Sequence, residues 1–444
     1  MSVVGDIYDV KFLTFNTWGL KFVSKHRKER LRAIADKLAG KSAAIPLPGS
    51  ETLRSDECEL EDDYDVVALQ EIWCKSDWDY IVSRCHQKYP YYRIFYSGIL
   101  AGPGLAILSK IPIESTFLYR FPINGRPSAF FRGDWYVGKS VSITLLKPLS
   151  KSTYPLAILN SHMHAPYALK GDAAYHCHRS CQAWDFSKIA NLYKKAGYAV
   201  VIVGDLNSRP GSLPHQFLTK ETGLVDSWEQ LHGEQDLQLI SRMDPHDQIR
   251  LGGTTCDSIL NTWRAQRRPD EACRLDYALV DPERLETVQA RVKFTEQIPN
   301  VGSFSDHFAY NCTLRLLPKS ESQPKNPPKR DLLLDKLANY EEMLQVLAKY
   351  RRVSKWQKLW RGTHFWLSVL IIIIIHVVTT FTSNRAGWSS VFWVFFATFM
   401  AVTGLIDGLI SFLFGRSEIR ALEEVSQEVR DSRREIQETL ENKL

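Results

Sequence analysis

The stretch that decides the fold is Ala199-Val200-Val201-Ile202-Val203-Gly204-Asp205-Leu206-Asn207. Its apolar first half predicts a short strand that is buried on at least one face. The carboxylate of Asp205 and the amide of Asn207 come directly after this strand, where they can hydrogen-bond a water molecule or a phosphoryl oxygen. A single acid at a strand end is more often a cap or turn residue, so the rest of the chain has to supply the context.

Similar apolar runs, separated by helical stretches, occur through the first 317 residues. The expected strands are Lys11–Phe15, Asp65–Leu69, Leu105–Leu108, Ser140–Leu146, Leu156–Asn160, Ala199–Val203, Tyr277–Val280 and Phe308–Leu314. Helical periodicity marks Arg27–Leu38 and Ala174–Lys195. The alternation predicts an α/β layered body, residues 1–317, with a large sheet content. Residues 41–63 are polar and then acidic, which is typical of a disordered surface insert.

Two further strand ends offer ligands for a metal ion. Asn16 and Glu71 each follow a strand-like run, so both can project toward one site. A carboxylate with a neutral amide oxygen suits Mg²⁺. His162 ends another run and can donate a hydrogen bond to a phosphoryl oxygen.

The string Ser305-Asp306-His307 supplies a candidate general base. A histidine oriented by a carboxylate is well suited to accept a proton near neutral pH. His307 is therefore the expected base and Asp276 its expected orienting residue. Asp306 can contact a metal ion or support the attacking water, and the sequence leaves both roles open.

The ordered set from Asn16 to His307 is hard to obtain by chance, and it resembles the DNase-I-like endonuclease/exonuclease/phosphatase superfamily across residues 10–315. The flanking residues narrow the likeness to the neutral sphingomyelinases, and over nearly the whole chain to their fungal relatives, the inositol phosphosphingolipid phospholipases C. The stretches that carry it are Phe15–Leu20, Ser24–Arg27, Gln70–Trp73, Ser97-Gly98, Gly133–Trp135 and His162–Ala165.

The resemblance implies a four-layer β-sandwich that hydrolyses the phosphodiester of inositol phosphosphingolipids to ceramide and a phosphorylated inositol. It also implies dependence on Mg²⁺, which Mn²⁺ can replace, and activation by anionic phospholipids such as phosphatidylserine. Sphingomyelin is the alternative substrate. A lipid-binding scaffold without catalysis is the alternative from another class, although such a module needs no general base.

Residues Gly133–Ser140 match the spacing of a phosphate-binding P-loop. The residues that follow alternate as a strand does rather than opening a helix, so we expect no ATP binding. The resemblance implies that Asp134 and Lys139 contact the substrate phosphate or regulate the enzyme. An exposed salt pair on a hairpin is the alternative.

Histidines and cysteines gather between residues 162 and 181, but their spacing fits no standard zinc finger. The group consists of His162, His164, His176, Cys177, His178 and Cys181. His164 is more simply a neighbour of the substrate or of the catalytic groups.

The end of the chain differs in composition. A proline-rich linker and a basic helix are expected over 318–361, a two-helix transmembrane hairpin over 362–415, and a charged helix over 416–444. Basic residues precede the first span and follow the second, which predicts that the body and both termini are cytosolic. The endoplasmic reticulum is the expected membrane, with the mitochondrial outer membrane as the alternative.

The overall composition agrees with a membrane-facing cytosolic enzyme. The net charge is +6, which suits anionic lipid and is too small for a dedicated nucleic-acid binder. The eight cysteines include no Cys-x-x-Cys pair and are expected to be reduced. No cleavable signal peptide is expected at the amino terminus. The helices at 331–350 and 416–444 are expected to pair within the chain or to form a homodimer.

Overall fold

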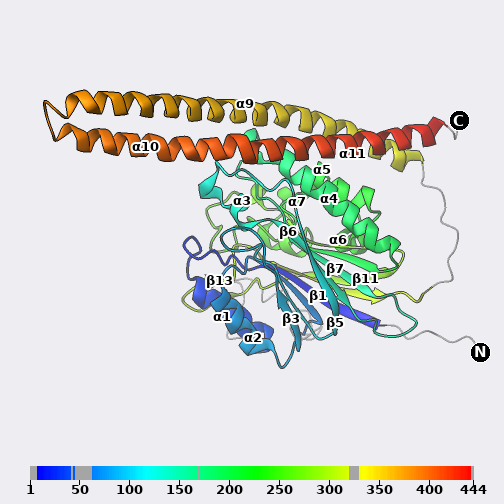
Figure 1. The fold of residues 1–444 in the computed structure, drawn as a ribbon. Helices are drawn as coiled ribbons and strands as arrows, with labels where there is room; N and C mark the ends of the chain where they lie inside the picture. Colours follow the sequence, from blue (N-terminus) through cyan, green and yellow to red (C-terminus); the bar gives the residue numbers. More distant parts are fainter. Residues whose placement is uncertain (1–7, 42–43, 46–62, 169, 320–329, 442–444) are drawn as a thin grey trace, which may run out of the picture. The chain divides into compact units, whose positions relative to one another are not determined.

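Two six-stranded sheets form the core of the computed structural model, which describes residues 8–41, 44–45, 63–168, 170–319 and 330–441 (Figure 1). Most of the expected insert at 41–63 and of the linker after residue 318 lies outside the described residues. The first sheet has the strand order β11-β14-β1-β2-β4-β3, and the second has the order β5-β6-β7-β8-β10-β9.

The strands of the first sheet are β1 (Tyr8–Asn16), β2 (Val66–Gln70), β3 (Tyr91–Ile94), β4 (Ala106–Ser109), β11 (Leu285–Lys293) and β14 (Ala309–Leu316). Those of the second are β5 (Ile113–Arg120), β6 (Ser140–Leu146), β7 (Leu156–His162), β8 (Ala199–Asp205), β9 (Val225–Asp226) and β10 (Asp276–Val280). A separate short pair is β12 (Gln297–Ile298) with β13 (Gly302–Ser303). Each strand expected from the sequence is present, within a few residues of its predicted bounds.

Each sheet has one parallel pair at its centre, and these pairs position the site. Strand β1 runs parallel to β2, with Asn16 opposite Gln70. Strand β7 runs parallel to β8, with His162 opposite Asp205. Because parallel strands end at the same edge of a sheet, the polar residues at their carboxyl ends are brought together there.

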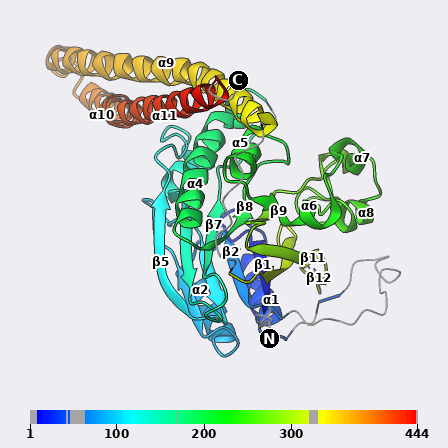
Figure 2. The same ribbon diagram turned by 90° about the vertical axis from the view of Figure 1, so that its right-hand side faces the viewer.

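Helices cover the outer faces of both sheets. The helices of the body are α1 (Arg27–Leu38), α2 (Lys75–Cys85), α3 (Asp134–Val137), α4 (His176–Lys195), α5 (Leu213–Gln216), α6 (Ser227–His232), α7 (Leu237–Ser241) and α8 (Pro245–Arg250). Shorter helical turns are η2 (Phe130–Arg132), η3 (Asp172–Ala174), η4 (Phe217–Glu221) and η5 (Pro269–Glu271). In Figure 1, α1 and α2 (blue) and α4 (green) flank the strands from opposite sides, and Figure 2 shows α4 along the second sheet.

Strand alternation builds two apolar layers from one run of sequence. In β1, Val10 and Phe12 face the other sheet and pack against residues such as Val201 of β8. Leu13 and Phe15, which point to the opposite face of the sheet, belong to the cluster formed with α1 and α2. This period of two makes one strand serve both faces of its sheet. The expected four-layer α/β sandwich is therefore confirmed.

The carboxyl-terminal part forms a second unit made of long helices. Helix α9 (Arg330–Thr382) runs unbroken through the expected bound at residue 361. It is followed by α10 (Ser389–Leu409), the π-turn η6 (Ile410–Phe414) and α11 (Gly415–Glu441). The described residues contain two helices that are long and apolar enough to cross a membrane. Their apolar windows are only 11% and 6% buried, which is unlike the core helix of a soluble protein.

The two long helices lie antiparallel and close together (Figure 1). A side chain at Gly404 would meet Ser368 at 2.6 Å, so glycine permits the close approach. Asp407 accepts a hydrogen bond from Arg361 and forms an ion pair with His364 Nδ1 at 2.8 Å. Glu418 of α11 accepts from the hydroxyl of Tyr350 at 2.6 Å. By contacts, this unit also includes residues 125–132.

Candidate active site

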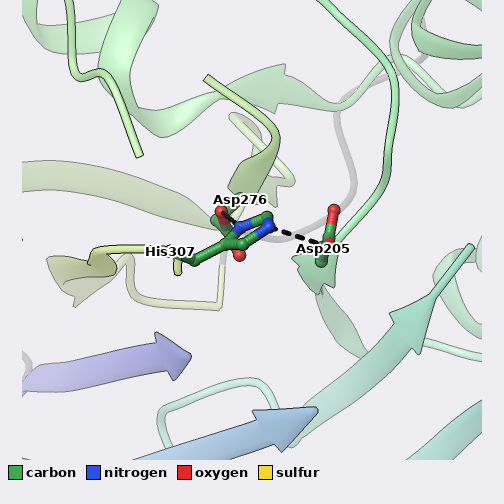
Figure 3. A group of neighbouring side chains, drawn as sticks. All are labelled: Asp205, Asp276 and His307. Carbon is green, nitrogen blue, oxygen red and sulfur yellow. Dashed lines mark hydrogen bonds and ion pairs between the residues drawn. The ribbon is translucent and has the colours of Figure 1, made fainter. Parts of the chain in front are cut away.

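Three buried side chains form an acid–base group between the ends of β8, β10 and β14 (Figure 3). His307 Nδ1 lies 2.8 Å from Asp276 Oδ2, and its Nε2 lies 3.8 Å from Asp205 Oδ2. Asp276 is the first residue of β10 and pairs with Asp205 across the antiparallel ladder. The expected partnership of His307 with Asp276 is present in the structure.

The backbone around Asp205 explains the Gly-Asp-Leu-Asn string. Gly204 has a φ of +130°, and a Cβ there would lie 2.0 Å from the Ser161 carbonyl oxygen, so only glycine fits. Asn207 has a φ of +47°, and its backbone N–H donates to Asp205 Oδ1 at 3.0 Å. The Asn207 amide nitrogen in turn donates to the Met163 carbonyl at 3.0 Å. These hydrogen bonds hold the side chains of Asp205 and Asn207 in place before any substrate binds.

Asn16 links two of the acids. Its Nδ2 donates to Glu71 Oε1 at 3.2 Å and to Asp205 Oδ2 at 3.0 Å. Its Oδ1 accepts from the Trp18 N–H at 3.0 Å. Glu71 Oε2 accepts from Trp73 Nε1 at 3.3 Å. For Asn16 to offer its oxygen to a metal beside Glu71, as the sequence predicts, the amide has to turn over; that role stays a prediction.

The acids at this edge fit a divalent cation. Burial raises the pKa of Glu71, and the nearby carboxylate of Asp306 raises it further. Gathering carboxylates in a desolvated place is unfavourable unless a cation compensates them. Hard carboxylate and amide oxygens are the ligands that Mg²⁺ prefers. The ligand atoms of Asp205, Asp276 and His307 also lie within 4.8 Å of one another.

Asp306 has a partner that the sequence analysis missed. Arg264 Nη2 donates to Asp306 Oδ2 at 2.5 Å. The guanidinium comes from a loop after Asn261 that has no periodic pattern, so no sequence signal marks it. Asp306 thus enters the site as one half of an ion pair, and its contact with a metal or a water stays a prediction.

His162 lies on the other side of Asp205. Its Nε2 is 3.5 Å from Asp205 Oδ2 and 3.9 Å from Glu71 Oε1. Burial, together with the charge of Lys139, lowers the pKa of His162 well below its ordinary value. The ring is therefore neutral, and a neutral imidazole has one N–H with which it can donate to a phosphoryl oxygen.

Asp205 and His307 lie close enough for the charge of each to shift the pKa of the other. Burial alone would lower the pKa of His307, but the carboxylates of Asp276 and Asp205 raise it well above its ordinary value. Burial raises the pKa of Asp205 to about 7, against the opposing charge of His307. Such a pair titrates as a unit. Near neutral pH it can take up one proton and give one up.

Asp134 and Lys139 form a buried pair, so the alternative of an exposed salt pair is wrong. Lys139 Nζ lies 3.2 Å from Asp134 Oδ1, and the side chains are 2% and 7% exposed. Asp134 Oδ2 accepts from the Tyr167 hydroxyl at 2.6 Å and lies 3.6 Å from His164 Nε2. Burial alone would raise the pKa of Asp134, but the charge of Lys139 holds that pKa below its usual value. The strand β6 begins directly after Lys139, as expected.

His164 and Cys256 complete the surroundings. Burial lowers the pKa of His164 to about 3, so it is a neutral neighbour of Asp134. Cys256 Sγ lies 3.5 Å from His307 Nε2 and was not singled out from the sequence. An isolated thiol before a loop carries no pattern that would have identified it.

The sequence matches the family model described as "Endonuclease/Exonuclease/phosphatase family" over residues 13–307. It is also 63% identical to the inositol phosphosphingolipids phospholipase C of Saccharomyces cerevisiae, over 100% of this chain and 94% of that protein. The chain belongs to the endonuclease/exonuclease/phosphatase family. The protein of the same description from Schizosaccharomyces pombe is 34% identical over 96% of this chain and 94% of its own length. The family resemblance stated from the residues is confirmed.

More distant relatives are sphingomyelinases. Sphingomyelin phosphodiesterase 2 of Homo sapiens is 31% identical over 49% of this chain and 46% of its own length. Among solved structures, the beta toxin of Staphylococcus aureus is 18% identical, covers 68% of this chain and 99% of its own, and has a TM-score of 0.45. The family match makes this chain a phosphoric diester hydrolase of the phospholipase C and sphingomyelinase type, the enzyme class that was expected.

Proposed function

We propose that this enzyme hydrolyses the phosphodiester of inositol phosphosphingolipids to ceramide and a phosphorylated inositol headgroup, using Mg²⁺. The observation that carries the proposal is the buried group of Asp276, His307 and Asp205 beside Glu71. A relative that is 63% identical over the whole chain and is named for this lipid class supports the choice of substrate.

The attacking group is a water molecule, and the Asp205–His307 pair removes its proton. A bond forms between the water oxygen and phosphorus, and the bond from phosphorus to the ceramide oxygen breaks. The pair then gives its proton to that oxygen, so that ceramide leaves as an alcohol. With a pKa raised to about 7, Asp205 is suited to take part in this transfer near neutral pH. Asp276 holds the His307 ring through Nδ1 at 2.8 Å. We therefore assign the base to the pair rather than to His307 alone.

The remaining residues position the phosphate and stabilise its charge. Asn207 is held beside Asp205, and neutral His162 can donate to an oxygen of the five-coordinate phosphorus. Glu71 and Asn16 would hold Mg²⁺, which when bound supplies positive charge to the phosphoryl oxygens. The buried Asp134–Lys139 pair lies near enough for Lys139 to lower the pKa of His162, which supports a role for it next to the phosphate.

The membrane is proposed to be that of the endoplasmic reticulum, with the body and both termini in the cytosol and the mitochondrial outer membrane as the alternative. Two apolar helices and the basic residues before and after them support this orientation. The same basic residues would attract anionic phospholipids such as phosphatidylserine. Contacts of Tyr350 and Arg351 in α9 with Glu418 and Glu423 in α11 support pairing within one chain, with the homodimer as the other outcome of a mass measurement.

The test is ceramide release by the full-length protein in vesicles that contain inositol phosphoceramide. His307→Ala and Asp205→Ala are expected to reduce turnover by at least about 10³-fold, because each removes part of a unit that acts together. Asp79→Ala is the matched control, since Asp79 is an exposed carboxylate paired with Lys75 on α2. Circular dichroism and vesicle flotation establish that each variant is folded and membrane-bound. Turnover retained in either site variant would contradict the assigned roles.

A further inference from the structure

We propose that a cavity beside Asn207 recognises the headgroup of the substrate, and that its arginines select a polyhydroxylated, anionic headgroup over a quaternary ammonium. The inference rests on the proposed function and deepens it, because it assigns the headgroup preference to residues. The cavity, called the arginine pocket below, has a volume of about 360 Å³ and is lined by Arg179, Arg209 and Arg267 together with Asn207. This size lies in the usual range for small-molecule sites, roughly 300 to 1,000 Å³.

The arginine pocket opens next to the reacting groups. Asn207 lines it and also donates its backbone N–H to Asp205 Oδ1. Cys273 lines it too, and its backbone pairs with that of Cys256, whose Sγ lies 3.5 Å from His307 Nε2. A phosphate held between Asn207 and His307 would therefore extend its headgroup ester into this cavity.

Two of the three arginines have no carboxylate partner within the part of the chain that the structure describes. Arg179 Nη1 donates to the Ala174 carbonyl at 2.7 Å, and Arg209 Nη2 donates to the Glu271 carbonyl at 3.0 Å. Arg267, in contrast, lies 3.2 Å from Asp257 Oδ1 and 3.7 Å from Glu271 Oε1. A guanidinium has five N–H donors, so Arg179 and Arg209 keep donors for a ligand.

The buried position of Arg179 makes an anionic ligand favourable. The residue is 9% exposed, and burial lowers its pKa to about 10. The carboxylate that acts on it, Asp134, is already paired with Lys139. A desolvated cation gains from an anion placed against it.

The start of α4 adds to the positive potential. Its first residue, His176, lines the arginine pocket. The first turn holds no acidic residue, and the residue before it makes no side-chain cap. The helix dipole favours negative charge or hydroxyl acceptors at such an end.

These features discriminate between the two headgroups. Inositol hydroxyls, and any further phosphate on them, accept hydrogen bonds from guanidinium groups. A choline group has no acceptor and binds in cages of aromatic rings or beside unpaired carboxylates. The acids that line the arginine pocket, Asp257 and Glu271, are taken up by Arg267. With three guanidinium groups against two carboxylates, and with Tyr167 as its one phenyl or indole ring, the lining suits inositol better than a quaternary ammonium.

The experiment compares Arg209→Gln with the wild type on vesicles that contain inositol phosphoceramide or sphingomyelin. Arg209 is exposed, so its replacement should leave the fold intact. Because a hydrogen bond to a charged group contributes about 1.5 to 3 kcal/mol, kcat/KM for the inositol lipid should fall roughly 10- to 100-fold. Turnover of sphingomyelin should not fall. Arg250→Gln is the control, since Arg250 is an exposed arginine on α8 paired with Asp247.

A loss that is equal for both lipids, or no loss at all, would overturn the proposal. Arg179→Gln is a second variant with the same expected pattern, and Arg209→Lys should recover part of the activity because it keeps the charge. The control should match the wild type on both lipids.

Calorimetry separates this inference from the proposed function. In detergent, the full-length wild type should bind inositol phosphate at least about tenfold more tightly than the Arg209→Gln variant does. The wild type should also bind inositol phosphate at least about tenfold more tightly than it binds phosphocholine. Equal affinities would contradict the arginine pocket even if the enzyme cleaves inositol lipids. If the wild type cleaves no inositol lipid, the proposed function fails, and the binding measurement still decides whether the arginine pocket recognises inositol phosphate.

Discussion

The body buries charged side chains at its site, whereas the helical unit exposes apolar side chains on its surface. In the body, Asp205 is 1% exposed among other acids at the edge of two sheets. In the helical unit, Phe395 is 73% exposed and apolar side chains cover the surface. A reaction at phosphorus needs charged groups held away from bulk water. A helix in hydrocarbon needs an apolar surface, because nothing there compensates a charge.

Asp407 and Glu71 make the contrast specific. Asp407 lies inside the hairpin and is matched by both Arg361 and His364. Among the described residues, Glu71 accepts hydrogen bonds from two neutral donors, Asn16 and Trp73, and burial beside Asp306 raises its pKa. A matched buried acid fixes helices against each other, whereas an unmatched acid in a cleft is typical of a site that binds a cation.

Removal of the divalent metal should have the largest effect, and only on the body. A chelator is expected to abolish ceramide release, by at least about 10³-fold, because the acids around Glu71 then lack their cation. Added Mg²⁺ should restore it. Flotation with vesicles and the helical circular dichroism signal should not change. Full turnover in excess chelator would show that the acids act without a metal.

Asp407→Ala should have the next largest effect, and only on the hairpin. Loss of the acid leaves Arg361 and His364 facing each other unpaired, which costs about 3 to 5 kcal/mol for a buried pair. Hydrogen exchange in α10 should speed up, while cleavage of substrate in mixed micelles stays within about twofold. Thr398→Ala is the control, since that hydroxyl bonds its own helix at the Val394 carbonyl. Unchanged hydrogen exchange in Asp407→Ala would contradict the role of Asp407 in holding the two helices of the hairpin together.

A buried histidine outside the site should make the body sensitive to acid. Burial lowers the pKa of His215 to about 4, from about 6.5 in an unfolded chain. Between these values the unfolded state binds the additional proton, so stability falls as the pH falls. Compared with His215→Gln, the wild type should lose about 1.4 kcal/mol per pH unit, roughly 3 kcal/mol by pH 4. Urea unfolding from pH 7 to pH 4 measures this; parallel curves for the two proteins would contradict it.

The basic residues before the first span should have the smallest effect. Each lysine near an anionic surface contributes about 1 kcal/mol, so Lys355→Gln and Lys358→Gln together should weaken the affinity of the detergent-solubilised protein for phosphatidylserine micelles by roughly 30-fold at low salt. Neutral micelles should bind the variant and the wild type alike. An equal loss on both kinds of micelle would indicate a folding defect instead of an electrostatic one.

The sequence predicts the buried strands well and the edge strands poorly. Strand β8 is an unbroken apolar run because both of its faces are covered, and it was predicted to within two residues. Strand β5 lies at a sheet edge and buries none of its residues fully, so it has no apolar run to recognise. Strand β3 was missed for the same reason. Periodicity reports burial, and an edge strand has little of it.

The residues of the site also fall into a group that the sequence predicts and a group that it does not. The residues at strand ends could be placed together because parallel strands share an edge, and Asp205, His162 and Asp276 do meet there. Arg264 and the arginine pocket could not be predicted, since loops and the start of α4, which come from distant parts of the chain, form them. The burial of Asp134 with Lys139 also depends on packing that no local pattern encodes.

The most direct test of the account is hydrolysis of inositol phosphoceramide in water enriched in ¹⁸O, with mass spectrometry of both products. Attack of water on phosphorus, with the Asp205–His307 pair as base, places the label in the phosphate of the soluble inositol phosphate and leaves ceramide unlabelled. Labelled ceramide, release of ceramide phosphate, or no cleavage by the folded, Mg²⁺-loaded protein would contradict the central claim.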